Sequence, residues 1–141
     1  MKLGEQFKKD VATVPPDASI RKAAHVMRER GVGTVVVVND TGKPVGIVTD
    51  RDVALAVAVD EKDPDTEVRE IMPGELITIG EKEGIFNATQ YIFGYQVRRL
   101  PIVDSDGKLV GIVTMDDLVV LLARELGNLA EAIQPVLQAA E

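Results

Sequence analysis

The sequence repeats itself at a fixed offset of 65 residues. Val45-Gly46-Ile47-Val48-Thr49 returns as Val110-Gly111-Ile112-Val113-Thr114, and nine of the fifteen positions in residues 38–52 are identical to their counterparts in residues 103–117. Two unrelated segments of this length would share about one position. The chain is therefore a tandem duplication, and an element expected in one half is expected again in the other.

Each copy predicts the same order of elements. We expect strands at residues 10–14, 34–38 and 43–48, a helix at residues 18–30 and a second helix from about residue 50; the second copy has strands from residue 75, a helix at residues 83–94 and a helix from about residue 115. Ile20, Ala23 and Met27 give the first helix one apolar face, while a β-branched run and a Gly-containing turn mark the hairpin.

The predicted fold class is α/β of the α+β type, with two β-α-β-β-α repeats packed sheet to sheet about a pseudo-two-fold axis. We expect one shared core, because a half of about 60 residues is marginal alone. The expected organisation is a first repeat at residues 1–60, a polar linker at 61–70, a second repeat at 71–127 and a C-terminal helical extension at 128–141.

A stripe of large apolar residues runs along the last helix, at positions Leu118, Leu122, Leu126, Leu129, Ile133 and Leu137. We expect Leu118, Leu122 and Leu126 to complete the internal core, and the outer part to be available to a partner subunit. Gly127 and Pro135 predict a bend or break near Gln134.

Composition excludes several classes of function. The chain has no Cys and one His, so disulfides, thiolate catalysis, Cys-ligated metals and a multi-His metal site within one chain are excluded. A formal net charge of -7 argues against a surface that coats nucleic acid. Since we see neither an apolar signal core at the N-terminus nor a run of roughly 18–20 apolar residues, we expect a soluble cytoplasmic protein without a membrane partner.

The most repeated motif is Gly-Ile-Val-Thr-x-x-Asp, which ends in Thr49 and Asp52 and again in Thr114 and Asp117. Each copy lies where a strand ends and a helix begins. One interpretation is structural: Thr followed by Asp three residues later is a variant of the capping box. The other uses the same atoms, because a helix N-terminus and a hydroxyl suit a phosphate, and an ionised Asp suits the hydroxyls of a ribose.

The chain resembles a tandem pair of CBS domains, the regulatory modules first described in cystathionine β-synthase, and the small stand-alone proteins that carry only such a pair. The resemblance rests on the element order, the doubled motif and the segment from Val97 to Val103, and it covers about residues 5–125. It implies binding of an adenosyl ligand, such as AMP, ADP, ATP or S-adenosylmethionine, in clefts between the repeats, with no catalytic cofactor.

The resemblance also implies which residues meet. The Thr and Asp of one repeat would face strand residues of the other, giving one cleft with Thr49, Asp52, Ile77, Val97, Arg98 and Arg99 and another with Thr114, Asp117, Ala12, Val32, Gly33 and Thr34. Arg98 and Arg99 stand where the first copy has Gly33 and Thr34, so we expect their cleft to hold phosphate more tightly.

These features favour one of three functions. The leading hypothesis is a non-catalytic sensor of adenosyl nucleotides that acts as a homodimer on a downstream protein which the sequence does not identify. The alternative is a dimerisation module without nucleotide. An enzyme is disfavoured because the sequence offers no activated nucleophile, no Walker-type loop and no Ser–His–Asp arrangement, so we assign no catalytic residue.

Overall fold

The computed structural model describes residues 1–140, and the side chains of residues 1–134. Along the chain the elements are α1 (Leu3–Phe7), β1 (Thr13–Val14), α2 (Ile20–Arg30), β2 (Thr34–Val38), β3 (Pro44–Thr49), α3 (Asp50–Ala58), the short 3-10 helix η1 (Val68–Glu70), β4 (Ile79–Gly80), α4 (Ile85–Tyr95), β5 (Arg99–Val103), β6 (Leu109–Thr114) and α5 (Met115–Ala140). Over the residues that the structure describes, no helix is both long and apolar enough to cross a membrane.

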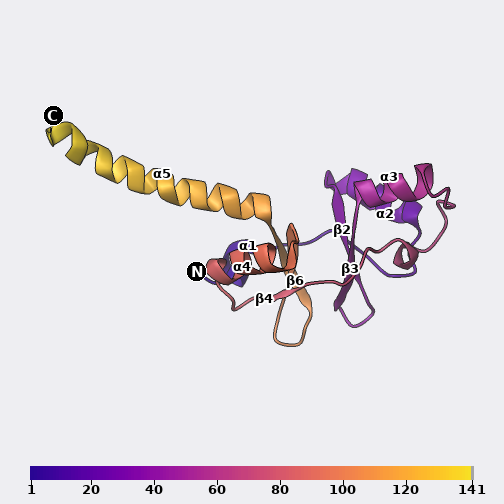
Figure 1. Ribbon diagram of the computed structural model, residues 1–141. Helices are drawn as coiled ribbons and strands as arrows, with labels where there is room; N and C mark the ends of the chain where they lie inside the picture. The colour runs from indigo at the N-terminus through magenta and orange to yellow at the C-terminus, as the bar shows by residue number, and fades with distance from the viewer. Residues whose placement is uncertain (141) are drawn as a thin grey trace.

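Two three-stranded sheets, one in each half of the chain, repeat the same topology (Figure 1). In the first sheet β1 is parallel to β2, and β2 is antiparallel to β3. The second sheet pairs β4, β5 and β6 in the same way, and Arg99 lies opposite Thr114 as Thr34 lies opposite Thr49. The predicted fold class of two related repeats with mixed helices and strands is confirmed.

Local sequence explains where the elements start and stop. Ser19 caps α2, since its hydroxyl accepts from the backbone N–H of Lys22 at 3.0 Å, and the helix ends at Gly31 with φ of 63°. The hairpin turns contain Gly42 and Gly107 at φ of 84° and 80°, which favours glycine. β1 and β4 are shorter than predicted, because each pairs with its neighbour over two residues only.

The expectation of one shared core is wrong, because each repeat has its own core between its sheet and its helices. Val35 and Val37 belong to the first core, and Leu100 and Ile102 hold the matching places in the second. Side chains alternate along a strand, so Val36, which is also fully buried, points to the opposite face. The central strands are thus buried on both faces, one against helices and one toward the other repeat.

The two repeats exchange their leading segments: the segment that precedes each repeat packs into the core of the other repeat. Leu3, near the start of the chain, is fully buried in the second core, while Val68 of η1, 65 residues later, is fully buried in the first. Backbone bridges follow the same symmetry: Lys2 pairs with Gly84. Glu67, the counterpart of Lys2, pairs in the same way with Ser19, the counterpart of Gly84. The segment expected to be a plain linker, residues 61–70, therefore contributes Val68 to the core of the first repeat.

Helix α5 leaves the second repeat and extends beyond the rest of the molecule (Figure 1). Leu118 is buried as expected, but Leu122 and Leu126 are 44% and 67% exposed, so the prediction that they complete the internal core is wrong. Of the bend or break expected near Gln134, a break is absent, because α5 is one helix through Pro135. The side chain of Leu137 lies outside the described residues.

Candidate functional site

Two clefts lie between the repeats, and each is lined by both of them. The Thr114 cleft, of about 340 Å³, is lined by Lys9, Asp10, Val11, Ala12, Arg30, Val32, Gly33, Thr34, Val36, Arg99, Ile112 and Thr114. The Thr49 cleft, of about 280 Å³, is lined by Ile47, Thr49, Asp52, Pro73, Glu75, Leu76, Ile77, Val97, Arg98 and Arg99. The clefts are symmetry mates, because Ala12 and Ile77, Thr34 and Arg99, and Thr114 and Thr49 correspond at the 65-residue offset.

The strand-to-helix junctions of β3–α3 and β6–α5 position the doubled motif. The hydroxyl of Thr49 accepts from the N–H of Asp52 at 3.2 Å, and the carboxylate of Asp52 accepts from the N–H of Thr49 at 2.9 Å. The same two bonds join Thr114 and Asp117, each at 3.0 Å. The capping-box interpretation is therefore confirmed for both copies.

Capping leaves each motif with unused hydrogen-bonding capacity. A Thr hydroxyl that accepts a bond still has its own O–H to donate, and the caps engage one carboxylate oxygen, Oδ2, of Asp52 and of Asp117. Both Thr49 and Asp52 are half-buried and line the same cleft. The structural and the ligand-binding interpretations of the motif are thus compatible in geometry.

The structure brings together most of the residues that the sequence nominated, in the pairing that the resemblance implied. Thr49, Asp52, Ile77, Val97, Arg98 and Arg99 all line the Thr49 cleft, and Thr114, Ala12, Val32, Gly33 and Thr34 line the Thr114 cleft. Asp117 is not among the residues that line this second cleft. Its carboxylate lies in the first turn of α5 and accepts from the N–H of Thr114. That these residues bind a ligand remains a prediction.

Arg99 is shared by the two clefts, whereas the sequence placed it with Arg98 in one. It begins β5, where it lies opposite Thr114 of the other cleft. Both arginines line the Thr49 cleft, and Arg99 also lines the Thr114 cleft. Among the described residues, neither guanidinium forms an ion pair.

Sequence reasoning missed two cationic residues of the Thr114 cleft, Lys9 and Arg30. The guanidinium of Arg30 donates to the backbone carbonyl of Asp10 at 2.9 Å and lies 3.6 Å from its carboxylate. The signal available was their position: Arg30 ends a helix just before the glycine that leads into β2, and Lys9 immediately precedes the cleft segment. Only the tertiary fold brings the end of α2 close to the segment that contains Lys9.

The two clefts differ in charge. The Thr114 cleft is lined by three cationic residues, Lys9, Arg30 and Arg99, and by one carboxylate, that of Asp10. The Thr49 cleft balances Arg98 and Arg99 against the carboxylates of Asp52 and Glu75. The charges therefore favour an anionic group in the Thr114 cleft, the reverse of the order expected when both arginines were placed in the other.

Comparison with known proteins finds the same duplication. The CBS domain matches at residues 5–59 and again at residues 68–124. An uncharacterized protein of Methanopyrus kandleri is 42% identical over 82% of this chain, which spans 60% of the relative. A CBS domain-containing protein of Bacillus subtilis is 42% identical over 78% of this chain and 77% of its own length. An inosine-5'-monophosphate dehydrogenase of Methanocaldococcus jannaschii is 34% identical, but this chain covers 23% of it.

Solved structures agree with the fold. A CBS domain pair in complex with 5'-methylthioadenosine and S-adenosyl-L-methionine superposes with a TM-score of 0.77 at 28% identity, covering 89% of this chain and 98% of its own. A CBS domain protein of Pyrobaculum aerophilum complexed with AMP gives a TM-score of 0.76 at 25% identity, covering 88% of this chain and 99% of its own. With its family matched over most of both repeats, this chain belongs to the CBS domain family and carries a pair of CBS domains.

Proposed function

We propose that this chain is a non-catalytic regulatory module that binds adenosyl nucleotides in the Thr49 and Thr114 clefts. The observation that carries the proposal is the pair of symmetry-related clefts, each of which sets a Thr-capped helix start against the strand residues of the other repeat. Related CBS pairs solved with AMP, or with 5'-methylthioadenosine and S-adenosyl-L-methionine, support this choice of ligand class.

Each part of a nucleotide has a suitable partner in the clefts. The apolar strand residues, such as Ile77 and Val97 in the Thr49 cleft, would cover the base. The free oxygen of Asp52 would accept from ribose hydroxyls, and the hydroxyl of Thr49 and the arginines would donate to phosphate. Asp117 lies in the first turn of α5 but does not line the Thr114 cleft, so we assign it the weaker contact.

The size of the clefts limits the ligand. Volumes of about 340 and 280 Å³ lie just above and just below the lower limit of the range of roughly 300–1,000 Å³ seen for small-molecule sites. One mononucleoside ligand per cleft fits this range, whereas a dinucleotide would have to extend outside it. We therefore propose AMP, ADP, ATP or S-adenosylmethionine as ligands, without a catalytic cofactor.

Nucleotide binding should raise the melting temperature. A ligand at a hundredfold excess over its Kd stabilises the folded state by about 2.7 kcal/mol. For a chain of this size the rise should be roughly 5–10 °C. Melting curves with AMP, ADP, ATP and S-adenosylmethionine at millimolar concentration test this, with inorganic phosphate and GMP as controls. No shift with any of the four adenosyl compounds would contradict the proposal and leave the module without nucleotide.

Substitution of the two arginines should distinguish AMP binding at one cleft from AMP binding at the other. Replacing Arg99 with Ala should weaken AMP about 10- to 100-fold at both clefts, because a charge-assisted bond to phosphate is lost at each. Arg98→Ala should affect the Thr49 cleft alone. Adenosine, which has no phosphate, should bind either variant nearly as it binds the wild type. Calorimetric titration at low salt measures both ligands, and equal losses for AMP and adenosine would show that the arginines do not contact phosphate.

We assign no enzymatic activity. The Thr49 cleft offers Asp52 and Glu75 as candidate acids or bases, but the carboxylate of Asp52 is engaged in its cap and neither group faces a nucleophile such as Cys or Ser in that cleft. We also propose that the module works in the cytoplasm as a homodimer that acts on another protein.

A further inference from the structure

The two clefts share one cationic side chain, that of Arg99. Arg99 begins β5, two residues before Pro101, and residues two apart in a strand point to the same face. Pro101 is fully buried and is the counterpart of Val36, which faces the other repeat. Arg99 therefore leaves its strand on the face between the repeats, where its half-buried side chain lines both clefts.

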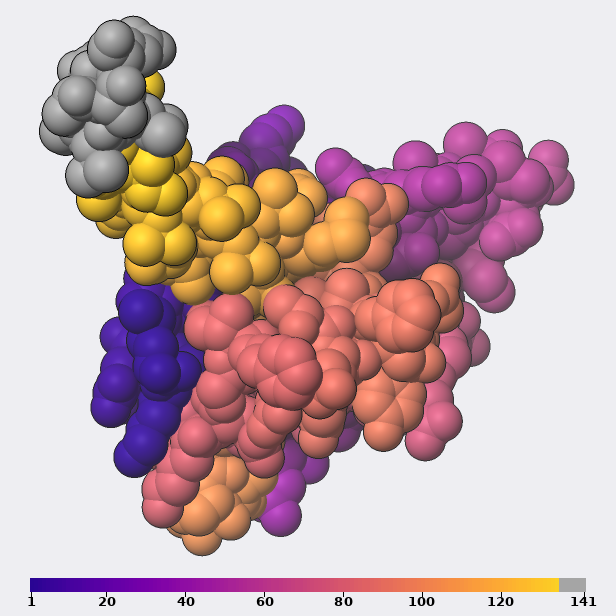
Figure 2. All heavy atoms as spheres, turned by 60° about the vertical axis from the view of Figure 1, so that its left-hand side comes forward, coloured from indigo at the N-terminus to yellow at the C-terminus, as the bar shows by residue number. Residues whose placement is uncertain are grey.

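The length of the arginine explains why it reaches both clefts. Thr34 holds the matching position in the first repeat, and its shorter side chain lines the Thr114 cleft alone. By symmetry Arg99 belongs to the Thr49 cleft, so its reach into the other cleft is additional. The repeats are close together (Figure 2), since the N–H of Leu109 donates to the carbonyl of Gly42 at 3.0 Å between the two hairpins.

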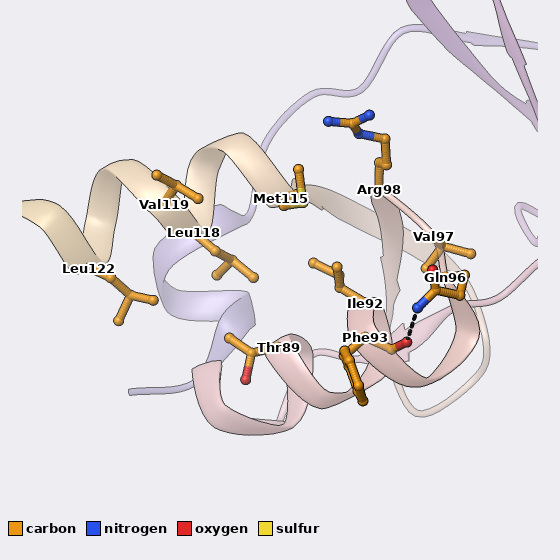
Figure 3. A pocket seen from close by; sticks show the side chains of 10 residues that line it. All are labelled: Thr89, Ile92, Phe93, Gln96, Val97, Arg98, Met115, Leu118, Val119 and Leu122. Atoms are coloured by element: carbon orange, nitrogen blue, oxygen red, sulfur yellow. Dashed lines mark hydrogen bonds between the residues drawn. The ribbon is translucent and has the colours of Figure 1, made fainter.

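The other cations of the clefts each belong to a single cleft. Lys9 and Arg30 line the Thr114 cleft, and Arg98 lines the Thr49 cleft. Figure 3 shows the guanidinium of Arg98 turned away from Leu118 and the apolar groove between α4 and α5. Of the described residues that line the two clefts, Arg99 alone is cationic and common to both.

The charge of each cleft depends on where the guanidinium of Arg99 lies. Without Arg99, the Thr114 cleft keeps two cations against one carboxylate. The Thr49 cleft keeps one cation, Arg98, against two carboxylates, those of Asp52 and Glu75. A phosphate is therefore held better in the Thr114 cleft, and the first phosphate to bind there should draw Arg99 with it.

One guanidinium cannot serve two phosphates equally well. A phosphate monoester carries about -1.5 to -2 charges near pH 7, and a guanidinium carries a single positive charge. The fork of donors on the guanidinium matches one phosphate. Once paired, the two groups together are net negative, so a second phosphate is repelled even where it reaches the remaining donors. Such coupling is reciprocal, because each phosphate weakens the other by the same factor.

We propose that the two clefts compete for Arg99. The module then holds one phosphate-bearing nucleotide tightly, in the Thr114 cleft, and occupancy of that cleft weakens a second phosphate in the Thr49 cleft about 10- to 100-fold. The Thr49 cleft is left to discriminate little between adenosyl compounds with and without a phosphate. The inference rests on the proposed function, and it adds the order and the coupling of the two binding events.

Calorimetric titration of the full chain with AMP at low salt tests the competition, and native mass spectrometry counts the bound molecules. The wild type should bind AMP in two steps. Arg99→Thr introduces the residue of the first repeat at the matching position and should weaken the first step about 10- to 100-fold. The second step should stay within about threefold, because the second AMP binds without Arg99 in either protein. The loss expected above for Arg99→Ala applies to each cleft while the other is empty.

A second guanidinium should relieve the competition. Thr34→Arg places one at the matching position of the first repeat, so that each phosphate has its own arginine. It should strengthen the second AMP step about 10-fold or more. The matched control is Thr34→Gln, which adds length without charge and should change that step less than about threefold. With circular dichroism confirming that both variants fold, no strengthening by Thr34→Arg, or equal strengthening by both, would overturn the proposal.

Adenosine distinguishes competition for phosphate from a general change of shape. Because it has no phosphate, both of its steps should stay within about threefold when Arg99 becomes Thr. The ratio of the Kd of adenosine to that of AMP should therefore be about 10- to 100-fold larger at the first step than at the second. Equal weakening of both AMP steps by Arg99→Thr, or of neither, would overturn the inference and leave the proposed function intact. A wild type that binds no AMP would contradict the proposed function and this inference with it.

Discussion

Replacing Leu3 with Ala should lower the free energy of unfolding by about 2–5 kcal/mol, although it is only the third residue of the chain. Leu3 is fully buried in the core of the second repeat, so its removal leaves a cavity there. A typical domain is stable by about 5–15 kcal/mol, so this is a large fraction of the total. Backbone bonds from Leu3 to Glu83 and from Gly4 to Glu81, each 2.9 Å, hold the segment in place.

Urea unfolding followed by circular dichroism measures the change. Gln6→Ala is the matched control, because Gln6 lies on the same short helix and is exposed. We expect the control to stay within about 0.5 kcal/mol of the wild type. A loss below about 1 kcal/mol for Leu3→Ala would mean that the N-terminal segment does not contribute to the second core.

Replacing Gly111 with Ala should cost about 3 kcal/mol, the upper end of the range for overpacking. A Cβ at this position would overlap the backbone carbonyl oxygen of Phe7, which cannot move without displacing α1. The counterpart Gly46 has the same place in the first sheet, but there a Cβ would overlap the sulfur of Met72, near the end of a flexible side chain. We expect Gly46→Ala to cost less than about 1.5 kcal/mol.

A double-mutant cycle links the two predictions. If Gly111→Ala pushes the N-terminal segment out of place, Leu3 is already removed from the core, and Leu3→Ala should add little to the loss. The combined variant should therefore lose clearly less than the sum of the single variants. Strict additivity would show that the glycine matters for its own strand and not for docking of the segment.

Local patterns sufficed for much of the fold. The β-branched run of β2 gave bounds identical to those of the structure, and the Thr–Asp motif gave both helix starts, because caps and strands depend on neighbouring residues. The pairing of the clefts came from the resemblance to tandem CBS domains, and most of the nominated cleft residues lie together as it implied.

Long-range packing accounts for what the sequence did not predict. Helix α1 has five residues and one buried side chain, so it has no periodic signal, and its role depends on contact with the other repeat. The apolar stripe of α5 predicted a helix with one apolar face, but it did not predict which surface packs against that face. The sharing of Arg99 between clefts likewise follows from the place where β5 begins.

The exchange of leading segments also bears on how the protein responds to dilution. In a chain with a single repeat, such a segment would reach a complementary repeat only on another molecule, and the exchange would depend on protein concentration. Here both repeats lie on one polypeptide, so each segment meets its repeat at a fixed effective concentration that does not depend on the protein concentration. For a short flexible tether this effective concentration is of millimolar order. The two cores are therefore expected to form together in a single molecule at any dilution, and neither repeat to fold when the chain is cut between them.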